Sequence, residues 1–317
     1  MKYNIFPISL VAFFLLMTST SVFAQNKYNT QWKNEKHNLQ LSFGTAHLYS
    51  DLGGGSDINE QTLTGLNFFS SRANLGFGYN LRLERLWNFK TGFNYAWLAG
   101  SDKYTKQENR KERGLSVETM VFELCAQIEF YITVQEEVKY VRGQMKKGFP
   151  FTSYIFGGLC GFAYVPMAMN DGKLVRLRPL GTEGQNSNSL PTRTPYSVLS
   201  WGVPFGVGFK YDVNEKIGLG LEWGIRWCFT DYLDDVSRSY APVEAFGTNK
   251  DAIYFGTLCA DHTYPETCTK PSHLAGEQRG NPNNDDAYMF INFSVYFKIG
   301  DKGGYRKTSI PNRYHRF

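Results

Sequence analysis

The chain has 317 residues and a formal net charge of +5, and 16% of its residues are aromatic. A mean hydropathy of −0.37 excludes a bundle of membrane helices, each of which needs an apolar run of about 18 residues or more. The high aromatic content is unusual for a soluble enzyme and typical of membrane barrels with aromatic girdles.

The N-terminus has the features of a secretory signal peptide. Lys2 supplies a positive charge, an apolar stretch follows, and the small residue Ala24 precedes Gln25. We therefore expect cleavage between Ala24 and Gln25, which removes residues 1–24 and exports the chain. A retained anchor helix is disfavoured because the apolar stretch is too short to span a bilayer.

Eight segments alternate apolar and polar residues with the two-residue period of a β-strand. These segments are residues 37–48, 71–84, 88–100, 115–132, 151–165, 196–211, 216–230 and 286–299. Each is at least about twice as long as the usual soluble strand of about five or six residues, and the length suits a tilted membrane strand. The pattern predicts an all-β fold, an eight-stranded antiparallel up-and-down transmembrane β-barrel over residues 37–300.

The seventh segment shows the alternation clearly. Leu221 and Trp223 belong to its apolar face, and Glu222 and Gly224 to its polar face. A soluble β-sandwich has the same period, so the alternation alone does not separate the two folds. Strand length and the aromatic residues near the strand ends favour a membrane barrel, whose apolar face lies outward.

Long and short connections alternate along the chain, as in bacterial barrels with long outer loops and short periplasmic turns. The expected outer loops are residues 49–70, 101–114, 166–195 and 231–285. The charged segment 133–148 is an exception on the periplasmic side. An even number of strands places an N-terminal segment, residues 25–36, and a C-terminal tail, residues 301–317, in the periplasm.

The two-residue period places nine charged residues on the predicted inward face. They are Arg72, Arg82, Glu84, Lys90, Glu123, Glu129, Lys210, Glu222 and Arg226. Buried charges must be paired, and eight strands enclose an interior just wide enough for side chains. We expect these residues to form a salt-bridged plug; a path for protons or solutes is the alternative.

Eight short motifs, which follow one another in a fixed order along the chain, carry a family resemblance. They are residues 113–116, 122–124, 128–130, 154–158, 177–185, 204–211, 229–237 and 278–281. With these motifs the sequence resembles the PorG-like outer-membrane barrel family. The resemblance implies a barrel that tethers the periplasmic ring of the type IX secretion system.

The outer loops contain residues that suggest ligand chemistry. The aspartates of residues 230–235 could supply oxygen ligands to Ca²⁺, but the segment lacks EF-hand spacing, and aspartate is a common turn-former. Cys259 and Cys268 share one loop of an exported protein, which favours a disulfide. With His262 and His273 they also mimic zinc-ligand spacing, a weaker interpretation because exported thiols usually oxidise.

The C-terminal tail concentrates the excess positive charge. Its basic residues are Lys302, Arg306, Lys307, Arg313 and Arg316. A disordered tail near anionic lipid head groups is one interpretation, and docking on a periplasmic partner is the other. The expected compartment argues against nucleic acid as the partner.

No catalytic constellation is visible, since the sequence contains neither a nucleophile elbow nor a phosphate-binding loop. We therefore expect a non-enzymatic protein of the cell outer membrane, with no cofactor, no metal and no small-molecule substrate. Its expected partners are outer-membrane lipid and periplasmic secretion-ring proteins. A surface binding or adhesion barrel that acts through its outer loops is the alternative, and a solute channel is disfavoured because such narrow interiors are filled.

Overall fold

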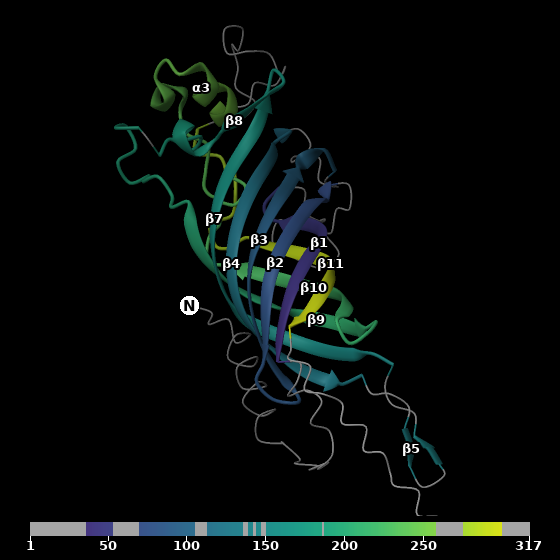
Figure 1. Ribbon diagram of the computed structural model, residues 1–317. Helices are drawn as coiled ribbons and strands as arrows, with labels where there is room; N and C mark the ends of the chain where they lie inside the picture. Colours follow the sequence, from purple (N-terminus) through teal and green to yellow (C-terminus); the bar gives the residue numbers. More distant parts are fainter. Residues whose placement is uncertain are drawn as a thin grey trace, which may run out of the picture.

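The computed structural model describes residues 36–52, 70–104, 113–135, 139–141, 144–146, 150–185, 187–257 and 275–299. Eight long strands dominate these residues and wrap into one barrel (Figure 1). They are β1 (His37–Tyr49), β2 (Arg72–Arg82), β3 (Trp87–Ser101), β4 (Ser116–Thr133), β7 (Thr152–Asn170), β9 (Leu199–Asp212), β10 (Ile217–Cys228) and β11 (Ala287–Ile299).

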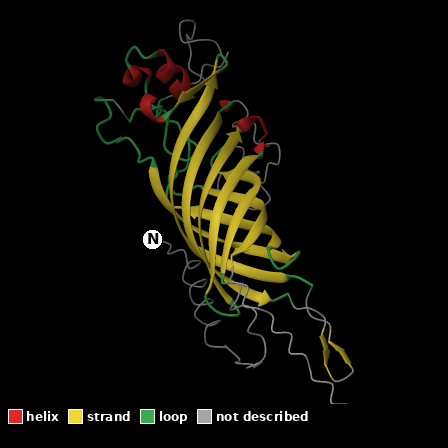
Figure 2. Cartoon of the chain, viewed as in Figure 1, coloured by secondary structure: helices red, strands yellow, loops and turns green. Residues whose placement is uncertain are grey.

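Short strands and helices lie at both ends of the barrel (Figure 2). They are β5 (Lys139–Val141), β6 (Gln144–Lys146), β8 (Lys173–Arg176), η4 (Asp102–Tyr104), η5 (Arg178–Leu180), η6 (Val243–Phe246) and α3 (Lys250–Thr257). Elements β8 and α3 lie at one end of the barrel and β5 lies at the other (Figure 1). None of the helices in the described ranges is both long and apolar enough to cross a bilayer.

The barrel is closed, and every pair of neighbouring strands in its wall is antiparallel. Each strand pairs with the next long strand in the chain, β4 pairs with β7, and β11 returns to pair with β1. This order confirms the predicted eight-stranded antiparallel up-and-down barrel. Closure leaves no strand edge unpaired in the wall, the condition for a β-structure in a lipid phase.

Strands β2, β7 and β10 end more than one residue away from the sequence prediction, and β10 ends at Cys228 instead of residue 230. Strand β2 ends at Arg82, because residues 83–86 form the turn into β3. Strand β7 continues to Asn170, where β8 replaces β9 as its neighbour. The β5–β6 hairpin was not predicted, since its two strands have only three residues each.

Side chains of the predicted polar face fill the barrel. On β4, Glu123, Gln127 and Glu129 are buried, while Leu124 and Ile128 between them are exposed on the outer surface. The same alternation continues on the other long strands, so the apolar residues of the sequence pattern face outward.

Glycines in the wall make room for rings in the lumen. Gly206 on β9 lies opposite Gly224 on β10, and the Phe156 ring occupies the space beside this pair. A Cβ atom on Gly206 would lie 2.2 Å from the Trp223 carbonyl oxygen and 2.8 Å from Phe156 Cζ. Glycine is therefore required where the strands and the ring approach so closely.

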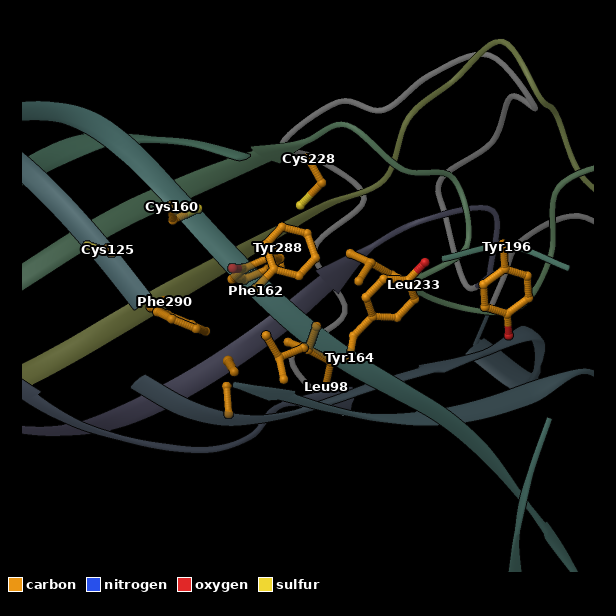
Figure 3. Close-up of a cluster of buried hydrophobic side chains, with 13 residues drawn as sticks. Leu98, Cys125, Cys160, Phe162, Tyr164, Tyr196, Cys228, Leu233, Tyr288 and Phe290 are labelled. Carbon is orange, nitrogen blue, oxygen red and sulfur yellow. The ribbon is translucent and has the colours of Figure 1, made fainter. Parts of the chain in front are cut away.

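A cluster of buried apolar side chains, many of them aromatic, fills the half of the lumen nearer the long connections (Figure 3). The rings of Phe162 and Tyr288 meet edge to face with centroids 5.7 Å apart. Cys125, Cys160 and Cys228 are buried free thiols that line the same cluster. They act as small apolar side chains, as their inward positions predict.

Candidate functional site

The outer surface of the barrel is an apolar belt. Leu124, Leu199 and Trp201 expose 66%, 67% and 69% of their surface. Other exposed members of the belt are Leu41, Phe43, Leu75, Phe77, Phe93, Ile128, Leu159, Phe209, Leu221 and Phe293. Contiguous apolar patches on soluble monomers rarely exceed a few hundred Å², so a belt around the whole wall suits contact with lipid.

Aromatic residues mark both margins of this belt. Trp201 and Trp227 lie near the end with the long connections. Phe151, Phe209 and Tyr211 lie near the end with the short turns, and the rings of Phe151 and Phe209 are in contact. Such girdles are found where membrane barrels cross the two interfaces of a bilayer.

The first of three buried ion pairs spans the middle of the lumen. Lys90 Nζ donates to Glu222 Oε2 at 2.6 Å, and the Tyr154 hydroxyl donates to the same oxygen at 3.0 Å. Lys90 is on β3 and Glu222 is on β10, which are not neighbours in the wall. The pair therefore connects opposite sides of the barrel.

The second pair joins β10 to β4. Arg226 Nε donates to Glu123 Oε2 at 3.2 Å, and the Tyr288 hydroxyl donates to the same oxygen. The other oxygen of Glu123 accepts from Asn94 Nδ2 at 2.7 Å. Each oxygen of this fully buried carboxylate is thus satisfied, which offsets the cost of removing its charge from water.

The third pair lies toward the end with the short turns. Lys210 Nζ donates to Glu129 Oε2 and, at 3.1 Å, to the Tyr131 hydroxyl. The ammonium also lies 4.6 Å from the centre of the Tyr154 ring. With three cations and three carboxylates, the three pairs have no net charge.

These pairs contain six of the nine residues predicted to charge the interior. Arg82 lies at the end of β2 with its guanidinium 5.0 Å from the centre of the Tyr131 ring. Two residues need correction. Arg72 pairs with the partly exposed Glu118 at 3.2 Å near the outer rim, and Glu84 is exposed in the turn that follows β2.

The long connections, which we call the cap, surround another buried cation, Arg279. Arg279 Nη1 donates to the Thr182 hydroxyl at 3.0 Å and to the Asp235 main-chain oxygen at 2.8 Å. The same nitrogen lies 3.3 Å from Glu183 Oε1, which also accepts the Ser237 main-chain N–H.

This network unites three of the motifs found in the sequence, residues 177–185, 229–237 and 278–281. They are far apart in the chain, yet the guanidinium of Arg279 in the third motif contacts both of the others. Asp235 adopts a left-handed backbone with φ of 63°, and its carboxylate accepts from the Tyr196 hydroxyl. The motifs therefore fold the cap, and the aspartate at this position has the turn role that the sequence suggested.

A further guanidinium links the cap to the strand ends. Arg113 Nε and Nη2 donate to the two carboxylate oxygens of Asp102 at 2.7 and 2.8 Å. Its Nη1 donates to the main-chain oxygen of Arg279. The sequence analysis did not select Arg113 and Asp102 as a pair; they lie 11 positions apart, near the two ends of the connection between β3 and β4.

Several aspartates of the cap are buried beside one another. Burial and the charge of Asp234 raise the pKa of Asp231 to about 9. Burial and the charge of Asp51 raise the pKa of Asp234 to about 8. Burial and the charge of Asp234 also raise the pKa of Asp286 well above its usual range. In the described part of the chain, no three His, Cys, Asp or Glu side chains stand arranged as a metal site.

Some predicted site residues lie outside the described residues. They are the cleavage position Ala24 and Gln25, the loop cysteines Cys259 and Cys268, the loop histidines His262 and His273, and the basic residues Lys302, Arg306, Lys307, Arg313 and Arg316.

Residues 66–269 match the model of a family described as a domain of unknown function, DUF6089. The match covers most of the chain, and the protein belongs to this family. No curated protein matches the sequence.

Three solved structures resemble the barrel weakly. Neisserial surface protein A has a TM-score of 0.38 and 9% identity, with 83% of this chain and 97% of that chain covered. OprG, an outer membrane protein of Pseudomonas aeruginosa, has a TM-score of 0.37 and 11% identity, with 84% and 98% covered. Ail, the attachment invasion locus protein of Yersinia pestis, has a TM-score of 0.36 and 7% identity, with 84% and 99% covered.

Proposed function

We propose that this member of the DUF6089 family is a non-enzymatic outer-membrane barrel that anchors the periplasmic ring of a type IX protein secretion machine. The closed wall with its apolar belt is the observation that carries the membrane location. Lipid removes this belt from water, while the strands of the wall pair in a closed circle that leaves no edge strand.

The filled lumen favours an anchor over a channel. Its ion pairs, Lys90 with Glu222, Arg226 with Glu123 and Lys210 with Glu129, cross the space that a solute would need. Phe156 and the buried cluster around Phe162 and Tyr288 also occupy space in the described lumen. We expect the protein to give almost no steady conductance in a planar bilayer.

The anchor role is supported by the PorG-like motifs and by one connection at the short-turn end. Residues 83–86 and 213–216 form four-residue turns there, but residues 134–151 make a much longer connection that contains the β5–β6 hairpin. A two-stranded hairpin offers main-chain groups to an added strand, a common way to recruit a partner. The basic tail, residues 301–317, is a second proposed contact.

The anchor role can be tested by crosslinking in native outer membranes. One variant replaces residues 135–149 with Asn-Gly, and a second lacks residues 301–317. We expect each to reduce the crosslinked and co-purified periplasmic ring proteins while the barrel keeps its heat-modifiable gel mobility. Met169→Ser with Leu174→Ser, on the β7–β8 hairpin at the opposite end, is the matched control and should leave ring proteins bound.

Unchanged recovery of ring proteins with both deletions combined would contradict the anchor role. The alternative is binding of an external partner through the cap, which is favoured by the exposed apolar side chains of Met169 and Leu174 on the projecting hairpin. In that case the Ser double variant loses its co-purifying partner, and the two deletions do not.

A further inference from the structure

A row of small residues crosses consecutive strands of the wall, from β3 to β10. Cys125 on β4 lies opposite Cys160 on β7, and Cys160 lies opposite Gly202 on β9. The row continues to Gly92 on β3, beside Cys125, and to Cys228 on β10, beside Gly202. All three cysteines are buried in the lumen cluster (Figure 3). The barrel therefore holds two cysteines directly opposite each other and a third beyond an intervening strand.

The main-chain groups of Cys125 point away from β7. In an antiparallel ladder the N–H and C=O of one residue point to the same neighbouring strand, and the direction alternates from residue to residue. The Tyr131 N–H donates to the Leu86 carbonyl, next to β3, at 2.8 Å, so every second residue of β4 before Tyr131 also points to β3. Cys125 is one of these residues, and its carbonyl oxygen accepts from the Thr91 hydroxyl on β3 at 3.1 Å.

The main-chain groups of Cys160 point away from β4. The Tyr164 N–H donates to the Val198 carbonyl, next to β9, at 3.0 Å. Cys160 lies an even number of residues earlier on the same strand, so its main-chain groups also point to β9. Cys125 and Cys160 are therefore a non-hydrogen-bonded pair, in which opposite Cα atoms lie about 4.5 Å apart. That separation is within the range of about 4.4–6.8 Å that disulfides span.

Glycines flank the two cysteines in the row. Gly92 lies beside Cys125, and Gly202 lies beside Cys160. Both cysteines are free thiols in the structure, and Cys160 Sγ lies 3.2 Å from the position that a Cβ atom on Gly202 would take. Rotation about the Cα–Cβ bond to another staggered position turns this sulfur from β9 toward β4. No side chain of the row stands between the two sulfurs.

Cys228 lacks this geometry. Strand β9 stands between it and Cys160, and neighbouring strands lie about 4.8 Å apart, so the two Cα atoms are about 9–10 Å apart. Cysteines whose Cα atoms are more than about 7 Å apart cannot be bridged without movement of the backbone. The row thus contains one pair that can be oxidised and one buried thiol that cannot join it.

We propose that Cys125 and Cys160 form a disulfide between β4 and β7 when the exported chain is oxidised. The inference rests on the proposed outer-membrane location, because exported chains meet thiol oxidants in the periplasm. The thiolate of one cysteine attacks the disulfide of a periplasmic thiol oxidant, and the thiolate of the other then displaces the oxidant from the mixed disulfide. Each cysteine loses one proton, and the two electrons reduce the oxidant to a dithiol.

Oxidation has to precede closure of the barrel. In the folded wall Cys125 and Cys160 expose only 3% and 1% of their surface, so a protein oxidant cannot reach them. Each is the other's nearest cysteine along the chain, which favours their pairing before the strands assemble. The bond then joins the two strands that carry the 134–151 connection with its β5–β6 hairpin. A crosslink also restricts the unfolded chain and so favours the folded barrel.

The test uses the full-length protein from native outer membranes, with N-ethylmaleimide added at lysis and again after denaturation to block free thiols. Digestion without reductant and mass spectrometry then identify the linked peptides. We expect one linked pair that contains Cys125 and Cys160, together with alkylated Cys228. Dithiothreitol should separate the linked pair and make both cysteines available to iodoacetamide.

Cys125→Ser is the decisive variant, and Cys228→Ser is the matched control with the same substitution in the same row. In Cys125→Ser, Cys160 should be alkylated without reductant, whereas Cys228→Ser should keep the linked peptides. Dithiothreitol should lower the urea midpoint of Cys228→Ser by about 1 M more than that of Cys125→Ser, because only the control has this crosslink to lose. Heat-modifiable gel mobility checks that both variants fold.

Two results would overturn the proposal. One is full alkylation of Cys125 and Cys160 without reductant in protein that has the gel mobility of the folded barrel. The other is a linked peptide that joins either of them to Cys228, since that bond contradicts the strand register. Neither result bears on the anchor role, which is measured separately by the recovery of ring proteins.

Discussion

The lumen and the cap both bury carboxylates, but they neutralise them differently. Glu123, Glu129 and Glu222 in the lumen each contact an ammonium or guanidinium group. Asp231 and Asp286 in the cap have no ion pair with any residue that the structure describes. The lumen carboxylates are therefore neutralised by cations, whereas burial and neighbouring charges raise the pKa values of Asp231 and Asp286 in the cap.

The difference also concerns how each region is connected. Pairs in the lumen join strands across the barrel, so breaking one is expected to weaken the whole wall. The Arg279 network joins loop segments to one another, and its loss is expected to open the cap while the barrel stays closed. Stability in one chain can vary between regions in this way.

The largest effect is expected from Lys90→Met. This change leaves Glu222 buried without its cation, which costs about 3–5 kcal/mol in the free energy of unfolding. Urea unfolding in detergent, followed by tryptophan fluorescence, measures the loss. Lys90→Met with Glu222→Met should recover most of it, because the apolar pair leaves no buried charge. A single variant within about 1 kcal/mol of wild type would show that the pair is not needed to neutralise the lumen.

Arg279→Met should act on the cap alone. It leaves Glu183 and Asp235 without their guanidinium, so proteolytic cleavage within residues 187–257 should become about tenfold faster or more through local opening. Gel mobility of the unboiled barrel should stay that of the folded form. Arg176→Met, an exposed residue on β8, is the control for loss of a cap charge. Loss of the folded form would mean that cap and barrel unfold together.

A smaller effect is expected from pH in the absence of divalent cations. The pKa of Asp231 is raised to about 9 and that of Asp234 to about 8, above their unfolded values of about 4. The folded cap therefore binds more protons than the unfolded chain, and its stability falls as pH rises from about 4 to about 9. Protease protection of the cap in EDTA should be greater at pH 6 than at pH 9. A flat profile, or better protection at pH 9, would contradict the raised values.

The two-residue period, together with the strand lengths and the aromatic residues near the strand ends, predicted the barrel from sequence alone. Strand geometry sends alternate side chains to opposite faces, so Leu221 and Trp223 had to face one side and Glu222 the other. The same pattern placed six charged residues in the lumen. It failed at the two ends of β2, where Arg72 lies partly exposed at the rim and Glu84 lies in the turn.

Which buried charges pair with one another depended on the closed barrel. Lys90 and Glu222 are 132 positions apart on strands that do not touch, so no local pattern predicts that they pair. The contacts of the cap depended even more on the tertiary structure, because Arg279 contacts residues of motifs that are separated along the chain. Likewise, the sequence showed that residues 230–235 are rich in aspartate, but only the fold brought Asp51 and Asp286 beside them. Alternation is a local property of the backbone, whereas charge compensation depends on distances that exist only once the strands have closed.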